Sequence, residues 1–326
     1  MYFRLYQKRP SATMSGVKKS NPVLVILIVL STVVFAGLQV LNYLAADPAN
    51  SYGLFQHGIS NVSAMYPLDV TPAGATFAIW GVIYAWQALI LIYSLTSVCR
   101  QTTEGPVYSN PTLLPPAFFV AYILNNVSNI TWLFLWDSLY LVASSIFLFL
   151  IAFSLYVCMI ISYVVLNKNK DALVCKGRQR EVWLIIFIVQ NGLAIYATWT
   201  SIASLINLGT VIAYATNPPM GREIASSIAL GILTAEFVAF VSTDLSVLNK
   251  YTRYVFTPYL VLIIACVGII AKNWDPTNPN SIFTVVILAL SLISFIAKII
   301  RMAVGGSHFK HRIESTLQHN YEALLK

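Results

Sequence analysis

Long apolar stretches alternate with short polar segments along most of the chain. Eight of these stretches approach the length of about 20 residues that an α-helix needs to cross a hydrocarbon core about 30 Å thick. They cover residues 22–46, 75–98, 114–136, 140–166, 182–207, 224–241, 255–271 and 282–300. The pattern therefore predicts an all-α integral membrane protein with eight transmembrane helices.

The composition favours the same class of protein. Of the 326 residues, 58% are hydrophobic and 10% are charged, whereas about a quarter of the residues of a soluble protein are charged. So few charged side chains cannot cover a surface that faces water. A soluble fold is therefore excluded, and the lipid bilayer is the expected surrounding.

The positions of the basic residues predict the topology. The N-terminal arm, three alternate loops and the segment from Lys298 onward hold 18 of the 20 Lys and Arg residues. Only Arg222 and Lys272 fall on the other side of the predicted membrane. Because cytoplasmic loops carry an excess of Lys and Arg, we expect both termini to lie in the cytoplasm. The net charge of +8 then reflects topology, and no nucleic-acid partner is expected.

The first apolar stretch resembles a signal peptide in its flanking residues. Basic residues precede it, and Leu44, Ala45 and Ala46 follow. It is much longer than the apolar region of about 7 to 15 residues that signal peptides have, which favours an uncleaved anchor. Cleavage would leave a seven-span protein with a receptor-like topology, and that alternative stays open.

The two polar ends of the chain are not predicted to cross the membrane. From Phe309 to Leu325 every fourth residue is apolar, which places one apolar stripe on a helix. We therefore expect residues 305–326 to form an amphipathic helix on the cytoplasmic membrane surface, with a partly disordered tail as the alternative. The basic arm, residues 1–21, is expected to be a disordered topology determinant.

Motifs for metal binding and enzymatic catalysis are missing from the sequence. The four cysteines and four histidines do not have the spacing of metal ligands, so we expect neither a metal site nor a disulfide framework. Phosphate loops, nucleophile elbows and catalytic triads are also missing, which favours a protein that is not an enzyme and requires no cofactor. Asn61-Val62-Ser63 is a glycosylation sequon in the first external loop.

Three of the predicted helices carry aromatic and amide side chains on one face. The spacings of three and four residues that define such a face occur in Phe77, Trp80 and Tyr84; in Asn125, Asn129, Trp132 and Trp136; and in Tyr196, Trp199, Ala203 and Asn207. Amides in hydrocarbon need hydrogen-bond partners. The stripes therefore predict an intramembrane pocket, with aromatic packing and interhelical hydrogen bonds as the alternative. Trp136, Trp183 and Trp274 are assigned mainly to the aromatic belt at the membrane surface.

At these positions the sequence resembles the tryptophan-rich sensory protein and translocator protein family, called TspO. The stretch TPAGATFAIWGVIY, residues 71–84, matches a Pro-Gly helix start followed by an aromatic residue, Trp and Tyr. The other two motifs are NITWLFLW from Asn129 and the series Tyr196, Trp199, Ala203 and Asn207. They lie in order on the expected spans, and the resemblance covers about residues 22–215.

The sequence departs from the family pattern in three places. The Pro that usually separates the aromatic residue from the Trp of the first motif is missing, Ile195 stands in place of Pro, and Leu133 in place of Ser. The last three spans have no counterpart in five-helix members, although longer bacterial relatives carry such an extension. The expected organisation is a TspO-like five-helix bundle, residues 22–215, followed by three additional helices, residues 216–304.

The resemblance implies a pocket that opens toward the loop between the first two spans and binds a porphyrin, a haem-like tetrapyrrole or a sterol. Both transport and photo-oxidative breakdown of porphyrins are claimed for the family. The ligand-binding residues implied by position are Trp80, Tyr84, Asn129, Trp132, Tyr196, Trp199, Ala203 and Asn207. The residues implied to shape the pocket are Pro72, Gly74 and Phe77. Whether the protein forms a homodimer stays open.

Glu236 supports an alternative function, proton-coupled transport. It lies about midway along the sixth predicted span, and an intramembrane carboxyl group marks a functional site by default. The competing interpretation is a protonated Glu236 that hydrogen-bonds to the backbone or to an amide such as Gln190 or Asn191. Asp137 and Asp244 lie at span ends, where we expect water to solvate them.

Overall fold

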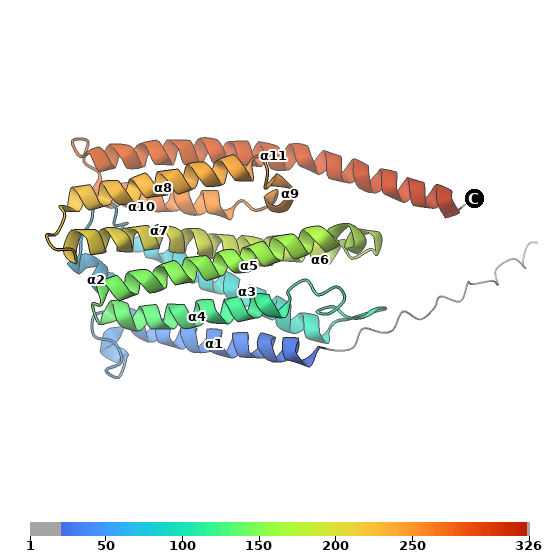
Figure 1. Ribbon diagram of the computed structural model, residues 1–326, viewed down its shortest axis with the longest axis horizontal. Coiled ribbons are helices and arrows are strands. Elements are labelled where there is room, and N and C mark those ends of the chain that lie inside the picture. The colour runs from blue at the N-terminus through green and yellow to red at the C-terminus, as the bar shows by residue number, and fades with distance from the viewer. Residues whose placement is uncertain (1–20, 325–326) are drawn as a thin grey trace, which may run out of the picture.

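The computed structural model describes residues 21–324, and it describes side chains as far as Val304. Within these residues the protein is a bundle of long helices with a short two-stranded antiparallel ribbon (Figure 1). The expected N-terminal arm lies outside the described residues, apart from Asn21. The apolar stripe expected in the tail lies outside the described side chains, although the backbone of the last helix continues to Leu324.

The elements of the first half of the chain are α1 (Pro22–Ala46), η1 (Pro48–Asn50), α2 (Ile59–Met65), η2 (Gly74–Ala78), α3 (Ile79–Cys99), β1 (Gln101–Thr102), β2 (Gly105–Pro106), α4 (Pro116–Asp137) and α5 (Leu141–Cys175). The second half contains α6 (Gln179–Leu184), η3 (Ile185–Gln190), α7 (Asn191–Tyr214), α8 (Arg222–Asp244), α9 (Asn249–Thr252), α10 (Thr257–Asn273) and α11 (Pro279–Leu324). The segments η1 and η2 are 3₁₀-helices, and η3 is a π-helix.

Capping residues explain where several helices begin and end. Asn21 accepts a hydrogen bond from the backbone N–H of Leu24 (3.2 Å), and Pro22 occupies the first turn of α1, where a missing N–H costs little. After α5, Gly177 adopts a φ of +68°, a left-handed conformation that glycine enters without steric cost. This residue reverses the chain so that α6 returns beside α5.

Seven described helical segments are long and apolar enough to cross a membrane. The remaining predicted span corresponds to α10, which has 17 residues. At a rise of about 1.5 Å per residue it is about 25 Å long, slightly less than a hydrocarbon core of about 30 Å. The chain is therefore a multi-pass helical membrane protein, and the count of eight full spans stays a prediction.

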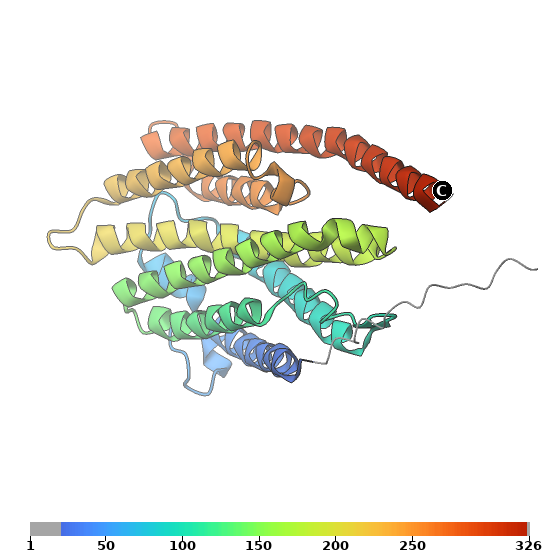
Figure 2. The ribbon, with the colours of Figure 1, turned by 45° about the vertical axis from the view of Figure 1, so that its right-hand side comes forward.

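The helix α7 lies at the centre of the bundle. It packs against α3 and α5 on one side and against α8 and α10 on the other. The helix α4 lies between α1 and α5, and α11 covers α8 and α10 from outside (Figure 1). Figure 2 shows that α3 crosses the other helices obliquely. Thus α7 connects the preceding helices α3 and α5 to α8 and α10, on which α11 packs.

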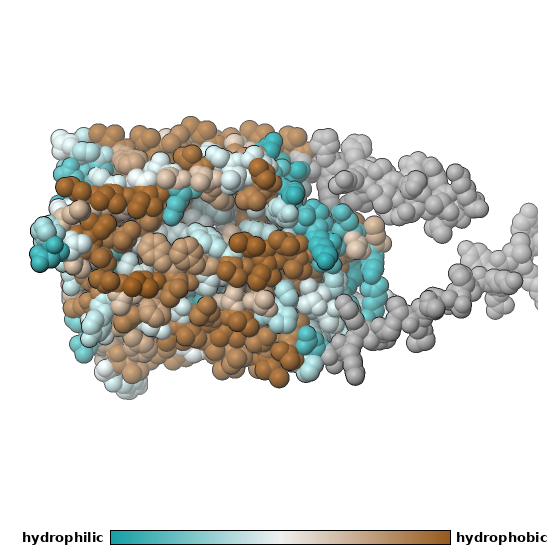
Figure 3. All heavy atoms as spheres, in the orientation of Figure 1, coloured by the Kyte–Doolittle hydropathy of each residue, from teal (hydrophilic) through white to brown (hydrophobic). Residues whose placement is uncertain are grey.

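The outer surface has the polarity of a membrane protein. Figure 3 shows apolar residues over the middle of the visible face and hydrophilic residues gathered at both ends of the bundle. Large apolar side chains such as Val33, Ile160 and Ile293 are more than 60% exposed (62%, 61% and 64%). Such a surface is matched to lipid rather than to water. The first residues of α1 and the last of α11 lie at the same end of the bundle (Figure 1).

The central span differs from its prediction in length and geometry. The elements α6, η3 and α7 form one continuous helix, Gln179–Tyr214, which extends beyond the predicted residues 182–207. Asn191 Nδ2 donates hydrogen bonds to the carbonyl oxygens of Ile186 (3.0 Å) and Tyr254 (2.9 Å), which ties the π-helical turn to the segment before α10. The suggested hydrogen bond between Glu236 and Asn191 or Gln190 is wrong, because Asn191 is bonded to Ile186 and Tyr254, and the side chain of Gln190 contacts Ser162 on α5 instead.

A buried ion pair connects the C-terminal helices. The side chains of Lys298 on α11 and Asp244 at the end of α8 are 0% and 1% exposed, and their charged atoms lie 2.8 Å apart. The expectation that water solvates Asp244 is wrong, because Lys298 and Tyr259 enclose its carboxylate. A span end in the sequence therefore becomes an interior position in the folded bundle.

Candidate functional site

The first aromatic motif begins where a loop meets the C-terminal helices. Pro72 is buried, and the next backbone N–H, that of Ala73, donates a hydrogen bond to the carbonyl oxygen of Gly268 in α10 (2.9 Å). Gly74 then starts η2, which leads directly into α3. This arrangement sets the position at which the aromatic side chains of α3 enter the bundle.

Trp80 is the centre of a cluster of aromatic rings. Its ring stacks on Tyr84, with centroids 5.4 Å apart, and on Trp132, with centroids 6.3 Å apart. The rings of Tyr196 and Trp199 meet it edge-on at 5.9 and 6.2 Å. Offset stacked and edge-on pairs at these distances are favourable arrangements of aromatic quadrupoles. The structure thus brings together the three stripes of α3, α4 and α7.

Asn129 joins the polar edges of these rings. Its Nδ2 donates to the hydroxyl of Tyr196 at 2.5 Å and lies 3.4 Å from the hydroxyl of Tyr84. The Tyr84 hydroxyl donates in turn to Asn42 Oδ1 on α1 (3.2 Å). The resulting chain of hydrogen bonds crosses four helices and satisfies polar groups that would otherwise be costly in the membrane interior.

Two neighbouring cavities share the side chains of Ile59, Phe77 and Trp80 as walls. The inner cavity has a volume of about 60 Å³, and its further lining includes Pro72, Trp132, Trp136, Trp199, Ala203 and Asn207. The outer cavity has a volume of about 450 Å³, and its further lining includes Gln39, Asn42, His57, Asn61 and Tyr84. Both therefore lie beside the segment that connects α1 to α3. We call the two together the aromatic site.

Several polar atoms around the aromatic site are buried without a hydrogen-bond partner among the described residues. They are the donors Gln39 Nε2, Trp132 Nε1 and Trp199 Nε1, and the acceptor Asn129 Oδ1. Buried polar atoms are nearly always paired, because an unpaired one costs about 1–3 kcal/mol. Gln39, Trp132 and Trp199 line the two cavities, so a bound molecule could satisfy their three donors.

The residues implied by the family resemblance take different places in this site. Trp80, Trp132, Trp199, Ala203 and Asn207 line the inner cavity, and Tyr84 lines the outer one. Asn129 and Tyr196 contact the ring cluster without lining either of these two cavities. Gly74 is exposed with open space around it, so it shapes the start of η2 rather than the cavity wall.

Trp136 belongs to the site, although the sequence assigned it mainly to the membrane-surface belt. Its side chain is 6% exposed, its ring stacks on Trp132 (6.2 Å), and its Nε1 donates to the carbonyl oxygen of Ile59 (3.2 Å). The belt assignment is therefore wrong. The sequence feature that indicates its place in the site is the spacing of four residues from Trp132, which puts both rings on the same face of α4.

Asp137 holds the loop that borders the outer cavity. Its carboxylate accepts hydrogen bonds from the backbone N–H groups of Gln56 (2.8 Å), His57 (2.8 Å) and Gly58 (3.0 Å). Three donors on one carboxylate satisfy the charge without water. The expectation of a solvated span end is wrong here too, and no local sequence signal pairs Asp137 with a loop about 80 residues away.

The other candidates from the sequence lie outside the ring cluster. Asn125 follows the packing alternative, because its Nδ2 donates to Ile151 O (3.0 Å) and Ser154 Oγ (3.1 Å) on α5. Asn61 is exposed on α2, and its glycosylation stays a prediction. Glu236 lies on α8 beside a separate cavity of about 140 Å³. Among the described residues, no group of three or more potential metal ligands occurs.

Comparison with known proteins agrees with this class of molecule, a multi-pass helical membrane protein with an aromatic cluster. The family described as TSPO-like protein matches residues 26–300. The chain therefore belongs to the TSPO-like protein family. The match continues past residue 215 through α8 and α10 and into α11. No curated protein and no solved structure matches the chain.

Proposed function

We propose that the protein binds a flat, largely apolar ligand in the aromatic site, either a porphyrin or haem-like tetrapyrrole or a sterol. The set of unpartnered buried atoms carries this proposal. Gln39, Trp132 and Trp199 contribute three donors that suit carboxylate, carbonyl or hydroxyl oxygens on a ligand. Aromatic walls with a few polar anchors are typical of small-molecule sites.

The cavity volumes indicate how such a ligand would enter. The outer cavity of about 450 Å³ lies within the range of about 300–1,000 Å³ for small-molecule sites, whereas the inner cavity of about 60 Å³ does not. Phe77 and Trp80 stand between the two. The ligand would therefore occupy the outer cavity first, and movement of these two rings would admit its edge to the donors of Trp132 and Trp199.

Replacing Trp199 tests the ligand site. We expect protoporphyrin and cholesterol, each titrated into the purified protein, to quench intrinsic tryptophan fluorescence. Trp199→Ala should weaken binding by at least about 1 kcal/mol, or about fivefold, because it removes an aromatic wall and a donor. Trp199→Phe keeps the aromatic wall and removes the donor, so it measures the contribution of Nε1.

Trp274 provides the matched control for this experiment. Its side chain is 54% exposed and lies outside both cavities, so Trp274→Ala should leave the affinity unchanged. Far-UV circular dichroism and the unfolding temperature would establish that each variant is folded. If folded Trp199→Ala binds both ligands as the wild type does, the ring cluster is a packing core and the proposal fails.

The proposed setting is an integral membrane protein with both termini in the cytoplasm. We call the end of the bundle that carries Arg100, residues 168–180, Lys250 and Arg253 the basic end. The start of α1 and the end of α11 lie at this end (Figure 1), so the positive-inside rule places it in the cytoplasm. The aromatic site then lies toward the opposite membrane surface. Binding there suits sensing or transport of the ligand, and neither role requires a metal or another cofactor.

Glu236 favours a second candidate function, proton-coupled transport. Its carboxyl group lies at membrane depth on α8 and borders a cavity between α5, α7, α8 and α10. Tyr156 and Tyr259 line the same cavity, and their hydroxyl groups are hydrogen-bonded to Ser201 Oγ (2.5 Å) and Asp244 Oδ2 (2.6 Å). Intramembrane carboxyl groups at such positions serve as proton relays in transporters.

Glu236→Gln distinguishes binding from coupled transport. Glutamine keeps the shape of the side chain but cannot release a proton, so gradient-driven porphyrin uptake into reconstituted vesicles should fall to the background rate. Ligand binding should persist, because the aromatic site lies on other helices. Glu223→Gln, at an exposed position in the first turn of α8, is the control. Wild-type uptake by Glu236→Gln would eliminate the coupled mechanism.

A further inference from the structure

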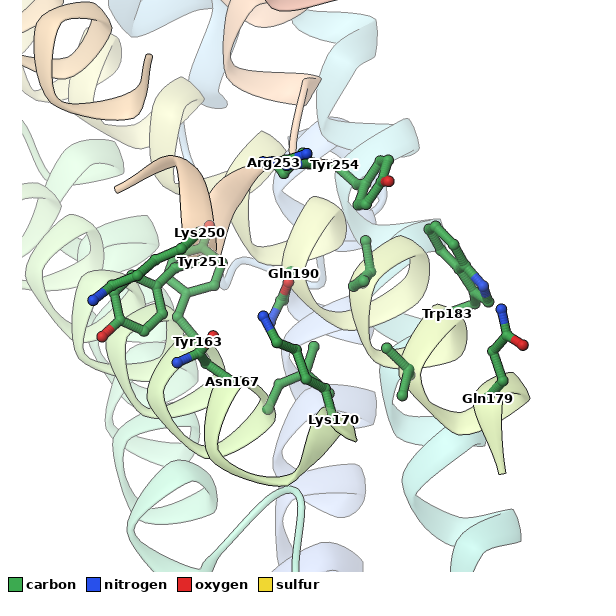
Figure 4. Close-up of a pocket in the computed structure, with 13 residues that line it drawn as sticks. Tyr163, Asn167, Lys170, Gln179, Trp183, Gln190, Lys250, Tyr251, Arg253 and Tyr254 are labelled. Carbon is green, nitrogen blue, oxygen red and sulfur yellow. The ribbon is translucent and has the colours of Figure 1, made fainter. Parts of the chain in front are cut away.

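A second large cavity lies at the basic end of the bundle, far from the aromatic site. It has a volume of about 530 Å³. Its walls come from the end of α5, from α6 and η3, and from α9 with the turn that follows (Figure 4). We call it the basic-end cavity. Because α9 connects α8 to α10, one wall of this cavity lies beyond residue 215 and consists of Lys250, Tyr251, Arg253 and Tyr254.

Three basic side chains line the basic-end cavity without acidic partners. Lys170 comes from α5, Lys250 from α9, and Arg253 from the turn after α9 (Figure 4). None of the three is in an ion pair within the described part of the chain, and no Asp or Glu lines the cavity. The nearby Asp244 is already paired with Lys298. The walls therefore carry an uncompensated positive charge.

The floor of the cavity is formed by the π-helical turn. Gln190 is 1% exposed, and its Oε1 is buried without a partner among the described residues. Its Nε2 has only a long contact of 3.4 Å with Ser162 Oγ. Figure 4 shows Gln190 among the side chains that line the cavity. A π-turn inside an α-helix frequently occurs at a functional site, and here it places an amide inside a cavity.

Aromatic and aliphatic side chains complete the walls. Trp183 and Tyr254 meet edge-on with centroids 4.9 Å apart, and Tyr163 and Tyr251 also line the cavity. Tyr and Trp gather at the level of the lipid head groups in membrane proteins. Leu166, Val182 and Ile186 supply the apolar part of the lining. The cavity thus combines cations, interfacial aromatic rings and an apolar wall.

We propose that the basic-end cavity binds an anionic phospholipid. Basic cavities between transmembrane helices on the cytoplasmic side suit anionic head groups, which are attracted by unpaired Lys and Arg. Lys170, Lys250 and Arg253 contact the phosphate, the Gln190 amide donates to or accepts from the head group, and the apolar wall contacts the first part of an acyl chain. The bound lipid connects α5 and α6 to α9.

Lipid selectivity of the purified full-length protein tests this proposal. Phosphatidylglycerol and phosphatidylcholine with identical acyl chains would be titrated in detergent and bound lipid counted by native mass spectrometry. We expect phosphatidylglycerol to bind at least tenfold more tightly. Lys170→Gln combined with Arg253→Gln should lower the ratio of the two lipid affinities at least fivefold. Lys168→Gln combined with Arg180→Gln removes the same amount of charge at exposed positions at the same end of the bundle. This control variant should change the preference for phosphatidylglycerol by less than twofold.

Two further measurements identify the source of the anionic group. Glycerol phosphate at millimolar concentration should displace the lipid only weakly, because it lacks the acyl chain; binding as tight as that of phosphatidylglycerol would overturn the lipid assignment. Gln190→Leu should weaken phosphatidylglycerol binding while protoporphyrin binding stays unchanged. Equal affinity for the two lipids, or an equal loss in both double variants with unchanged unfolding temperatures, would overturn the proposal.

Discussion

Replacing Lys298 by Met is expected to lower the free energy of unfolding by about 3–5 kcal/mol, because it leaves the buried carboxylate of Asp244 without its counter-ion. Lys298 Nζ donates to Asp244 Oδ1 (2.9 Å), to Asp244 Oδ2 (2.8 Å) and to the carbonyl oxygen of Thr252 (2.9 Å). All three ammonium hydrogens are therefore used. Thermal or denaturant unfolding in a single detergent measures the change.

A double variant separates the ion pair from simple packing. Asp244→Asn combined with Lys298→Met removes both charges, so it should recover much of the stability lost in Lys298→Met. The asparagine side chain of that variant keeps an acceptor for the Tyr259 hydroxyl, which donates to Asp244 Oδ2 (2.6 Å) in the wild type. Lys272→Met, at an exposed position near the end of α10, is the control. A single variant Lys298→Met as stable as the wild type would contradict the predicted cost.

The second large effect is expected from Gly268→Ala on α10. A Cβ atom at this position would lie 2.2 Å from Thr76 Oγ1, 2.7 Å from Thr76 Cγ2 and 2.9 Å from Thr76 Cβ. Such contacts cannot be accommodated without a shift of η2, and overpacking of this kind costs about 1–3 kcal/mol. Because η2 leads into the helix that carries Phe77 and Trp80, porphyrin affinity should fall by about tenfold.

Two comparisons make this prediction specific. Gly231→Ala on α8 has open space around its Cβ, so it should be neutral or stabilise the helix by up to about 1 kcal/mol. Thr76→Ala removes two of the three atoms that would clash, so it should restore part of the affinity lost in Gly268→Ala. The measurements are fluorescence quenching by protoporphyrin and the unfolding temperature. Unchanged ligand affinity in Gly268→Ala would show that α10 does not set the position of η2.

The contacts of α10 give the C-terminal helices a role in forming the aromatic site. Besides the bond from Ala73 to Gly268, Asn273 Nδ2 donates to the carbonyl oxygen of Thr71 (2.8 Å). Arg222 at the start of α8 pairs with Asp69 at 3.2 Å. The loop before the first motif is therefore held by α8 and α10, which lie beyond residues 22–215. A change in α8 or α10 would therefore reach the aromatic site through this loop.

The sequence by itself determined the class of protein, the positions of most membrane helices and the faces that carry the aromatic residues. These features depend on local properties: the length of an apolar stretch and the spacing of three and four residues along a helix. The spacing of Trp80 and Tyr84, for example, places both rings on one face whatever the helix packs against. The motifs also pointed to the family that the comparison confirms.

Only the tertiary structure decided which of these residues meet and which charges are buried. Asp137 contacts Gly58, Lys298 pairs with Asp244, and Gly268 packs on η2, and each contact joins positions far apart in the chain. No spacing rule encodes such contacts, because they depend on how whole helices cross. Glu236 lies midway along a predicted membrane helix, yet its side chain is exposed on the surface of α8. Asp244 lies at the end of the same helix, yet its side chain is buried. Whether a charged group is buried depends on which residues surround it in the fold, and the sequence alone does not determine those neighbours.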